Sequence, residues 1–160
     1  MKQVNPHTGL DMLNGNMSKQ AEADLILKLY DLRREETMRK ARDWYFREFN
    51  PETVEDITHT MFGEHSGHFR MVTSYWDMAA GLVNHGAISI EMFGDTNGEY
   101  FGVFAKLEKL LAPVRAQYGP HFMMQLEKLI DATPGGRERS AMMRERLKGM
   151  AEKMKTMAKS

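Results

Sequence analysis

The clearest pattern of apolar and polar positions in this 160-residue chain lies at residues 69–85, which carry only two formal charges. On a helical wheel, at about 100° per residue, the polar side chains of this segment gather on one side. They are Arg70, Ser74, Asp77, Asn84 and His85. The opposite, apolar arc spans roughly 200°, about twice the width usual for a surface helix. We therefore predict that residues 69–85 form the central helix of the fold.

The other helices are predicted from apolar stripes, N-cap residues and prolines. Ser18 is a suitable N-cap, Asn50-Pro51 and Pro120 can each begin a helix, and Thr96-Asn97-Gly98-Glu99 resembles a capping box. Pro113 is expected to kink the helix that contains it. The predicted segments are 18–49, 51–62, 69–85, a short turn at 89–93, 97–118, 120–132 and 137–159. The sequence thus predicts an all-α fold, a compact bundle of about six helices around the central one, held between 18–49 and 97–118.

The predicted helix 18–49 has apolar residues on two faces. Leu25, Leu29 and Leu32 mark the first face. Leu27 and Tyr30 begin the second, and Arg34 falls inside it. One face is enough to pack against a bundle, so the other favours contact with a partner.

Three regions are expected along the chain. Residues 1–17 are rich in Asn, Gly and Pro and predict a flexible leader, and residues 18–134 form the helical core domain. Residues 135–160 form a basic, Met-rich, amphipathic C-terminal helix or tail. Its apolar positions repeat at a 4-3-4-3 spacing, which is typical of a heptad-like seam. They are Met143, Leu147, Met150, Met154 and Met157.

Composition is that of an ordinary globular protein, 42% hydrophobic, 28% charged and formally neutral. The absence of cysteine excludes a disulfide framework, a thiolate metal site and a cysteine nucleophile. No segment resembles a signal peptide or a membrane span, so a cytoplasmic location is expected. Neutrality hides an asymmetry: residues 48–105 carry a net charge of −8 and residues 137–160 a net charge of +5. These two parts could attract each other, within one chain or between two.

Three interpretations of the polar side of residues 69–85 remain open. It could be a strip that faces solvent, or a structural network in which Asp77 pairs with Arg34 or Arg70 across the core. It could also be a ligand or acid–base site built from Arg70, Asp77 and His85. We expect a structural network before a catalyst.

Three histidines, His59, His65 and His68, lie close together in the sequence and could supply metal ligands. Their spacing matches no strong metal-binding motif, and histidines in a Gly-rich loop are commonly just solvated. The chain also lacks a nucleophile elbow and a phosphate-binding loop. We therefore assign no catalytic, cofactor-binding or metal-binding residue and expect no cofactor.

Two stretches, LILKLYDLRREETMRKARDWYFREF and FRMVTSYWDMAAGLVNHGAI, resemble a family of small, uncharacterised bacterial helical proteins. The resemblance covers roughly residues 23–130 and excludes the tail. It implies a bacterial origin and an all-α fold. It implies no activity and carries over no functional residue.

These observations predict a non-enzymatic helical module for protein interaction or self-assembly, whose partner is another protein or a second copy in a homo-oligomer. The alternative is a protein that binds a metal or small molecule through His59, His65 and His68, or through the Arg70–Asp77–His85 stripe. A third hypothesis is a nucleic-acid contact through the basic tail, which the lack of interleaved aromatic residues disfavours. Contact with a membrane is not expected.

Overall fold

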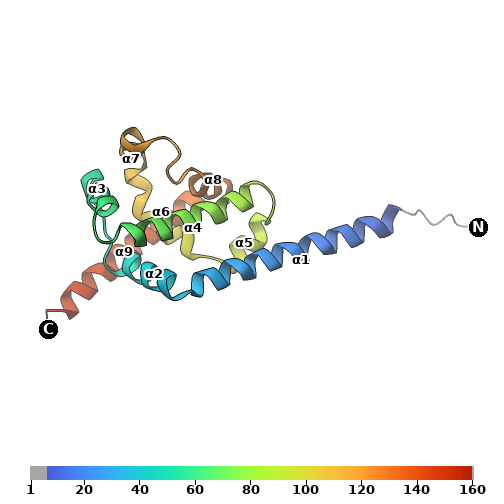
Figure 1. The fold of residues 1–160 in the computed structure, drawn as a ribbon, viewed down its shortest axis with the longest axis horizontal. Helices are drawn as coiled ribbons and strands as arrows, with labels where there is room; N and C mark the ends of the chain where they lie inside the picture. The colour runs from blue at the N-terminus through green and yellow to red at the C-terminus, as the bar shows by residue number, and fades with distance from the viewer. Residues whose placement is uncertain (1–6, 160) are drawn as a thin grey trace, which may run out of the picture.

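The computed structural model describes the backbone of residues 7–159 and the side chains of residues 19–159, and it is an all-α bundle, as predicted. Within these residues the chain forms α-helices and one short 3-10 helix, η1, without any strand (Figure 1). The helices are α1 (His7–Arg34), α2 (Glu36–Arg47), α3 (Val54–Phe62), α4 (Ser66–Asn84), α5 (Ile90–Thr96), α6 (Glu99–Leu107), η1 (Glu108–Leu110), α7 (Leu111–Tyr118), α8 (Met124–Ala132) and α9 (Gly136–Met157).

Helix α4 is the central helix, as its wide apolar arc predicted. It packs mainly against α2 and α8 and also contacts α3, α5 and α6. Its buried side chains include Phe69, Val72, Trp76 and Val83. Burial of this apolar surface is the main force that holds the bundle together.

The predicted helix 18–49 was wrong in being continuous, because the chain bends at Glu35 and forms two helices, α1 and α2. The backbone of Glu35 is extended, with φ −56° and ψ 142°, and its carboxylate accepts hydrogen bonds from the backbone N–H groups of Thr37 and Met38. Hydrogen bonds from backbone N–H groups to a carboxylate are charge-assisted and stabilise a helix start, so Glu35 begins a new helix.

The predicted capping box at Thr96–Glu99 was also wrong. The Thr96 hydroxyl donates to the Met92 carbonyl inside α5, and the Glu99 carboxylate binds Arg42. The capping box lies elsewhere, at the start of α3, where Thr53 and Asp56 satisfy each other's backbone N–H groups. Helix α3 therefore begins at Val54, three residues after Pro51.

The kink predicted from Pro113 takes the form of a short 3-10 segment, η1, just before it, and Pro113 itself lies in α7. Proline cannot donate a backbone hydrogen bond, and the helix narrows to η1 before it continues as α7. Helix α8 begins at Met124 and not at Pro120, because Met123 adopts a left-handed conformation with φ 54°.

Both terminal helices extend beyond the bundle, in opposite directions in Figure 1. Helix α1 begins at His7, before the expected Ser18 cap, so it includes residues 7–17 of the predicted leader. Residues 1–6 of that leader lie outside the described residues. None of the helices within residues 7–159 combines the length and apolar character that a bilayer span requires.

Candidate functional site

The polar side of α4 joins α4 to α8 at two residues. The Asp77 carboxylate accepts a hydrogen bond from the backbone N–H of Leu126, at 2.8 Å. The Asn84 side-chain amide donates to the backbone carbonyl and the side-chain oxygen of Gln125, at 2.9 and 3.0 Å. Because Met123 provides no side-chain cap, the first turn of α8 has free N–H groups, and Asp77 caps it from the neighbouring helix.

The predicted partners of Asp77 were therefore wrong. The Arg34 guanidinium lies over the Tyr30 ring, 5.4 Å from its centroid, and Arg70 is exposed and donates to the carbonyl of Ser66. Within residues 19–159 neither arginine forms an ion pair with Asp77. Burial raises the pKa of Asp77, while hydrogen bonds from the backbone of α8 and the charge of Arg115 act in the opposite direction.

The remaining members of the polar side, Ser74 and His85, are exposed. The Ser74 hydroxyl donates to the Arg70 carbonyl in its own helix, at 2.5 Å. The Arg70–Asp77–His85 stripe is thus divided between a structural contact and solvent, and its three side chains do not converge on a ligand.

The three histidines are only partly brought together. His65 stacks on Trp44 with ring centroids 4.9 Å apart, and His68 lies 5.8 Å from His65. His59 is exposed on α3 and lines a shallow hollow with His65. Among the described residues, no group of three or more His, Asp and Glu side chains is placed to hold a metal ion.

The first half of α9 is held to the bundle by arginines that the sequence interpretation did not single out. Arg137 binds Glu108, Glu127 and Asp131, with nitrogen–oxygen distances of 2.6–3.0 Å. Arg144 binds Glu108 as well. These ion pairs form within one chain, between the basic tail and acidic residues at 108–131, outside the acidic segment 48–105.

The apolar stripe of α9 changes its environment along the helix. Met143 and Leu147 are partly buried, whereas Met150 and Met154 expose 52% and 39% of their surface. Three residues of the stripe, Leu147, Met150 and Met154, line an open hollow of about 600 Å³ between α2 and α9, together with Ala151 and with Phe46 of α2. Arg39, Arg42, Asp43 and Arg47 complete its lining. We call this hollow the α2–α9 groove: it has an apolar floor and a mainly basic rim.

The second apolar face of α1 remains uncovered. Leu27 and Tyr30 expose 60% and 45% of their surface. Asp24 and Asp31, three and four residues from Leu27, lie on the same face and are exposed. Arg34, whose guanidinium lies over the Tyr30 ring, belongs to this face as well. The exposed α1 face therefore has an apolar middle with two carboxylates and one guanidinium beside it.

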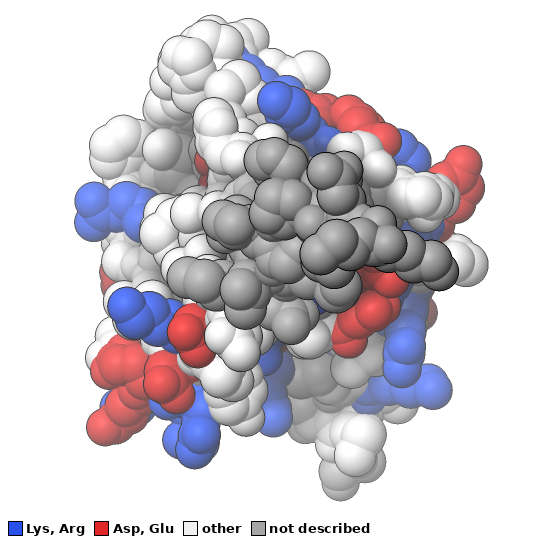
Figure 2. All heavy atoms as spheres, turned by 90° about the vertical axis from the view of Figure 1, so that its right-hand side faces the viewer, with Lys and Arg blue, Asp and Glu red and all other residues white. Residues whose placement is uncertain are grey.

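Figure 2 shows the molecule from the side toward which α1 extends. On this face acidic and basic side chains are interspersed around the margin, without a large patch of one sign.

Comparison with curated proteins and with solved structures found no match. A family model matches residues 20–133, which include most of the bundle from α1 to α8. The chain therefore belongs to the family described as a domain of unknown function, DUF4760.

Proposed function

We propose that this protein is a non-enzymatic interaction module that self-associates, with the exposed α1 face of one copy bound in the α2–α9 groove of another. The observation that carries the proposal is the groove itself, an apolar floor of Phe46, Met150 and Met154 that the chain's own helices leave open. An amphipathic helix laid into an apolar groove is a recurring mode of protein recognition.

The α1 face of a second copy offers this groove an apolar surface and two carboxylates, beside one cation, Arg34. Leu27 and Tyr30 would cover the apolar floor, and Asp24 and Asp31 would meet the basic rim at Arg39 and Arg47. Residues in the rim steer the approach and select the orientation more than they add affinity.

The groove of the same copy is out of reach of its α1. Helix α1 turns into α2 at Glu35 and runs away from α9 (Figure 1). A reciprocal exchange of α1 between two copies forms a closed, two-fold dimer with two equal contacts, which is the commonest symmetry of homo-oligomers.

A non-enzymatic role is supported by the use of Asp77 and Asn84, the most buried polar groups of the α4 stripe, as contacts to α8. A cytoplasmic location belongs to the same proposal: a chain without cysteine forms no disulfide and is compatible with a reducing compartment.

Light scattering coupled to size-exclusion chromatography tests the proposal on the full chain at low salt. We expect a dimer for the unaltered protein and a monomer for the double variant Met150→Glu/Met154→Glu. Met142→Glu is the matched control, because Met142 is 67% exposed on the same helix but lies outside the stripe. A monomeric unaltered protein, or a control that dissociates like the double variant, would refute self-association through the groove.

A charge exchange tests the identity of the occupant. Asp24→Arg/Asp31→Arg should weaken the dimer, and adding Arg39→Asp/Arg47→Asp in the same chain should restore it. If the second pair of substitutions weakens association further, the α1 face does not meet the basic rim and the occupant is wrong.

A further inference from the structure

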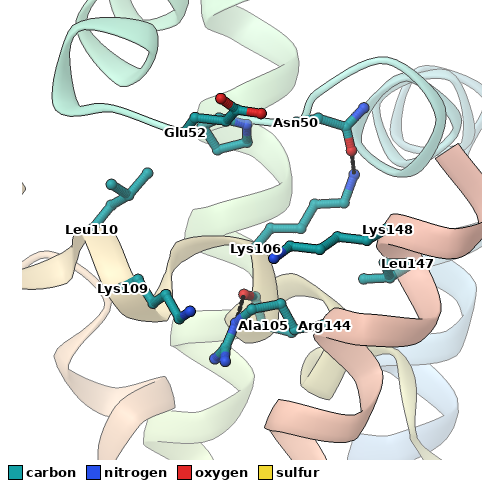
Figure 3. Close-up of a pocket in the computed structure, with 10 residues that line it drawn as sticks. Asn50, Glu52, Ala105, Lys106, Lys109, Leu110, Arg144, Leu147 and Lys148 are labelled. Atoms are coloured by element: carbon teal, nitrogen blue, oxygen red, sulfur yellow. Dashed lines mark hydrogen bonds between the residues drawn. The ribbon is translucent and has the colours of Figure 1, made fainter. Parts of the chain in front are cut away.

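A second hollow lies next to the α2–α9 groove and shares Leu147 with it, between α9, the end of α6 with η1, and the loop that joins α2 to α3 (Figure 3). It has a volume of about 310 Å³, within the range of small-ligand sites. Four basic side chains line it, Lys106, Lys109, Arg144 and Lys148, against one carboxylate, Glu52. We call it the basic cavity.

Two of the four cations are held in the wall by neutral and acidic partners. The Lys106 ammonium donates to the carbonyls of Tyr45 and Phe49 at the end of α2, at 2.8 and 2.6 Å, and to the side chain of Asn50 at 3.1 Å. Burial lowers the pKa of Lys106 to about 8, so it remains an ammonium at neutral pH. Arg144 donates to the Ala105 carbonyl and binds Glu108.

The other two cations are available. Lys109 is exposed and makes no hydrogen bond or ion pair with any residue that the structure describes. Lys148 has only a long contact, 3.8 Å, with the exposed Glu145. Figure 3 shows the ends of both side chains directed into the space between α9 and η1, on the side of the cavity opposite Glu52.

Gathering like charges around one space raises their energy unless an anion lies between them. We propose that the basic cavity binds a small organic anion, in which a phosphate or carboxylate group contacts Lys109 and Lys148 and an apolar part contacts Leu110 and Leu147. Ammonium groups are well suited to bind a phosphate as point charges, and hydrogen bonds between charged partners are stronger than neutral ones.

The apolar part of the ligand follows from the rest of the lining. Pro51, Leu110 and Leu147 contribute a hydrocarbon surface beside the cations. An inorganic ion would leave that surface in contact with water, whereas an aryl or alkyl substituent would cover it.

Isothermal titration calorimetry on the full chain, at constant ionic strength, tests the site with inorganic phosphate, phenyl phosphate and benzoate as probes. We expect phenyl phosphate to bind more tightly than phosphate. Benzoate distinguishes a carboxylate from a phosphate headgroup. If benzoate binds about as tightly as phenyl phosphate, the cavity is a general anion site, and if it binds much more weakly, the cavity is selective for phosphate. Either outcome supports binding in the cavity. The absence of binding heat for all three at millimolar concentration would overturn the proposal.

Substitutions locate the binding. Lys109→Gln and Lys148→Gln should each weaken phenyl phosphate binding roughly tenfold, the effect of one lost charge-assisted hydrogen bond. Glu52→Gln should strengthen it, because it removes the one carboxylate that lines the cavity. Lys128→Gln is the control, since Lys128 is also exposed, lies on α8 outside the cavity and changes the net charge by the same amount when substituted. A control that weakens binding as much as Lys109→Gln would show a non-specific charge effect and refute the site.

This inference is independent of the proposed dimer. The cavity and the α2–α9 groove are neighbours that share Leu147, but Lys109 and Lys148 do not line the groove, and Met150 and Met154 do not line the cavity. Failure of the calorimetric test therefore leaves the light-scattering result unaffected, and the reverse also holds.

Discussion

Replacement of Asp77 separates a structural role from the ligand-binding role that its position on α4 also suggested. Asp77→Ala removes the acceptor of the Leu126 N–H, which lies in a fully buried residue at the start of α8. Loss of an N-cap costs about 1 kcal/mol, and a buried donor left without a partner costs about 1–3 kcal/mol. We expect Asp77→Ala to lower the free energy of unfolding by about 2 kcal/mol, which corresponds to about 4–8 °C in Tm.

Asp77→Asn is the informative companion, because its amide oxygen can still accept the Leu126 N–H while its charge is gone. It should lose less than about half of the stability that Asp77→Ala loses. Ser74→Ala is the matched control on the exposed side of α4 and should change stability by less than about 0.5 kcal/mol. Urea denaturation followed by circular dichroism, at one protein concentration, measures all three. Equal losses for Asp77→Asn and Asp77→Ala would refute the capping argument and show that the charge itself is needed.

The pH dependence gives a second measure of the same group. Burial raises the pKa of Asp77 in the folded protein above its ordinary value of 3.8. At a pH between the pKa of Asp77 in the unfolded chain and its higher pKa in the folded protein, the folded state holds a proton that the unfolded chain has released. The contribution of this proton to stability is therefore complete below pH 3.8 and is lost as the pH rises through the folded pKa. The unfolding free energy of the unaltered protein minus that of Asp77→Asn should therefore fall as the pH rises from 3.8. A difference that rises with pH would mean that the α8 backbone and Arg115 outweigh burial.

Two further changes probe the packing of other helices. Gly136→Ala places a Cβ atom 2.0 Å from the Ile130 carbonyl oxygen and should lower the free energy of unfolding by about 1–3 kcal/mol. Gly149→Ala meets no atom within 4 Å and should stabilise α9 by about 0.5–1 kcal/mol. Thermal denaturation compares the two variants, and equal effects would contradict the steric argument. Glu99→Ala leaves Arg42 partly buried without its carboxylate and removes the acceptor of the Trp76 indole N–H, so it should cost about 3 kcal/mol and change tryptophan fluorescence. Glu36→Ala breaks only the exposed pair with Lys40 and should cost less than about 0.5 kcal/mol in the same denaturation experiment.

The central helix could be predicted because its signal is local. The period of apolar residues in 69–85 depends only on the helix geometry, and an arc too wide for a surface helix requires neighbours on several sides. The structure supplies them with α2, α8 and three other helices. The break before Pro113 was equally local, since a missing N–H follows from the residue type alone.

The partners of polar side chains could not be predicted in the same way. Glu35, Asp77 and Glu99 are ordinary acidic residues in the sequence, and each could have paired with a nearby arginine or faced solvent. Whether such a carboxylate pairs with an arginine, faces solvent or caps a helix depends on where backbone N–H groups are left without a partner. The positions of these N–H groups relative to the carboxylate are set only when the helices pack together. The left-handed turn at Met123, which opens the first turn of α8 to Asp77, has no clear signal in the residues around it.

The Met-rich stripe of α9 left open whether the helix docks on its own chain or associates with a partner, and the structure divides the stripe between these two roles. A heptad-like spacing predicts a coiled-coil seam, but a stable coiled coil requires about three to four heptads. Met143 and Leu147 pack against the chain itself, so only the last heptad or so, at Met150 and Met154, is open to a partner. Arg137 and Arg144 hold the first half of α9 in place without any second chain. The α2–α9 groove therefore exists before a partner arrives, and association should occur by insertion of a helix into the groove rather than by pairing of α9 with another α9.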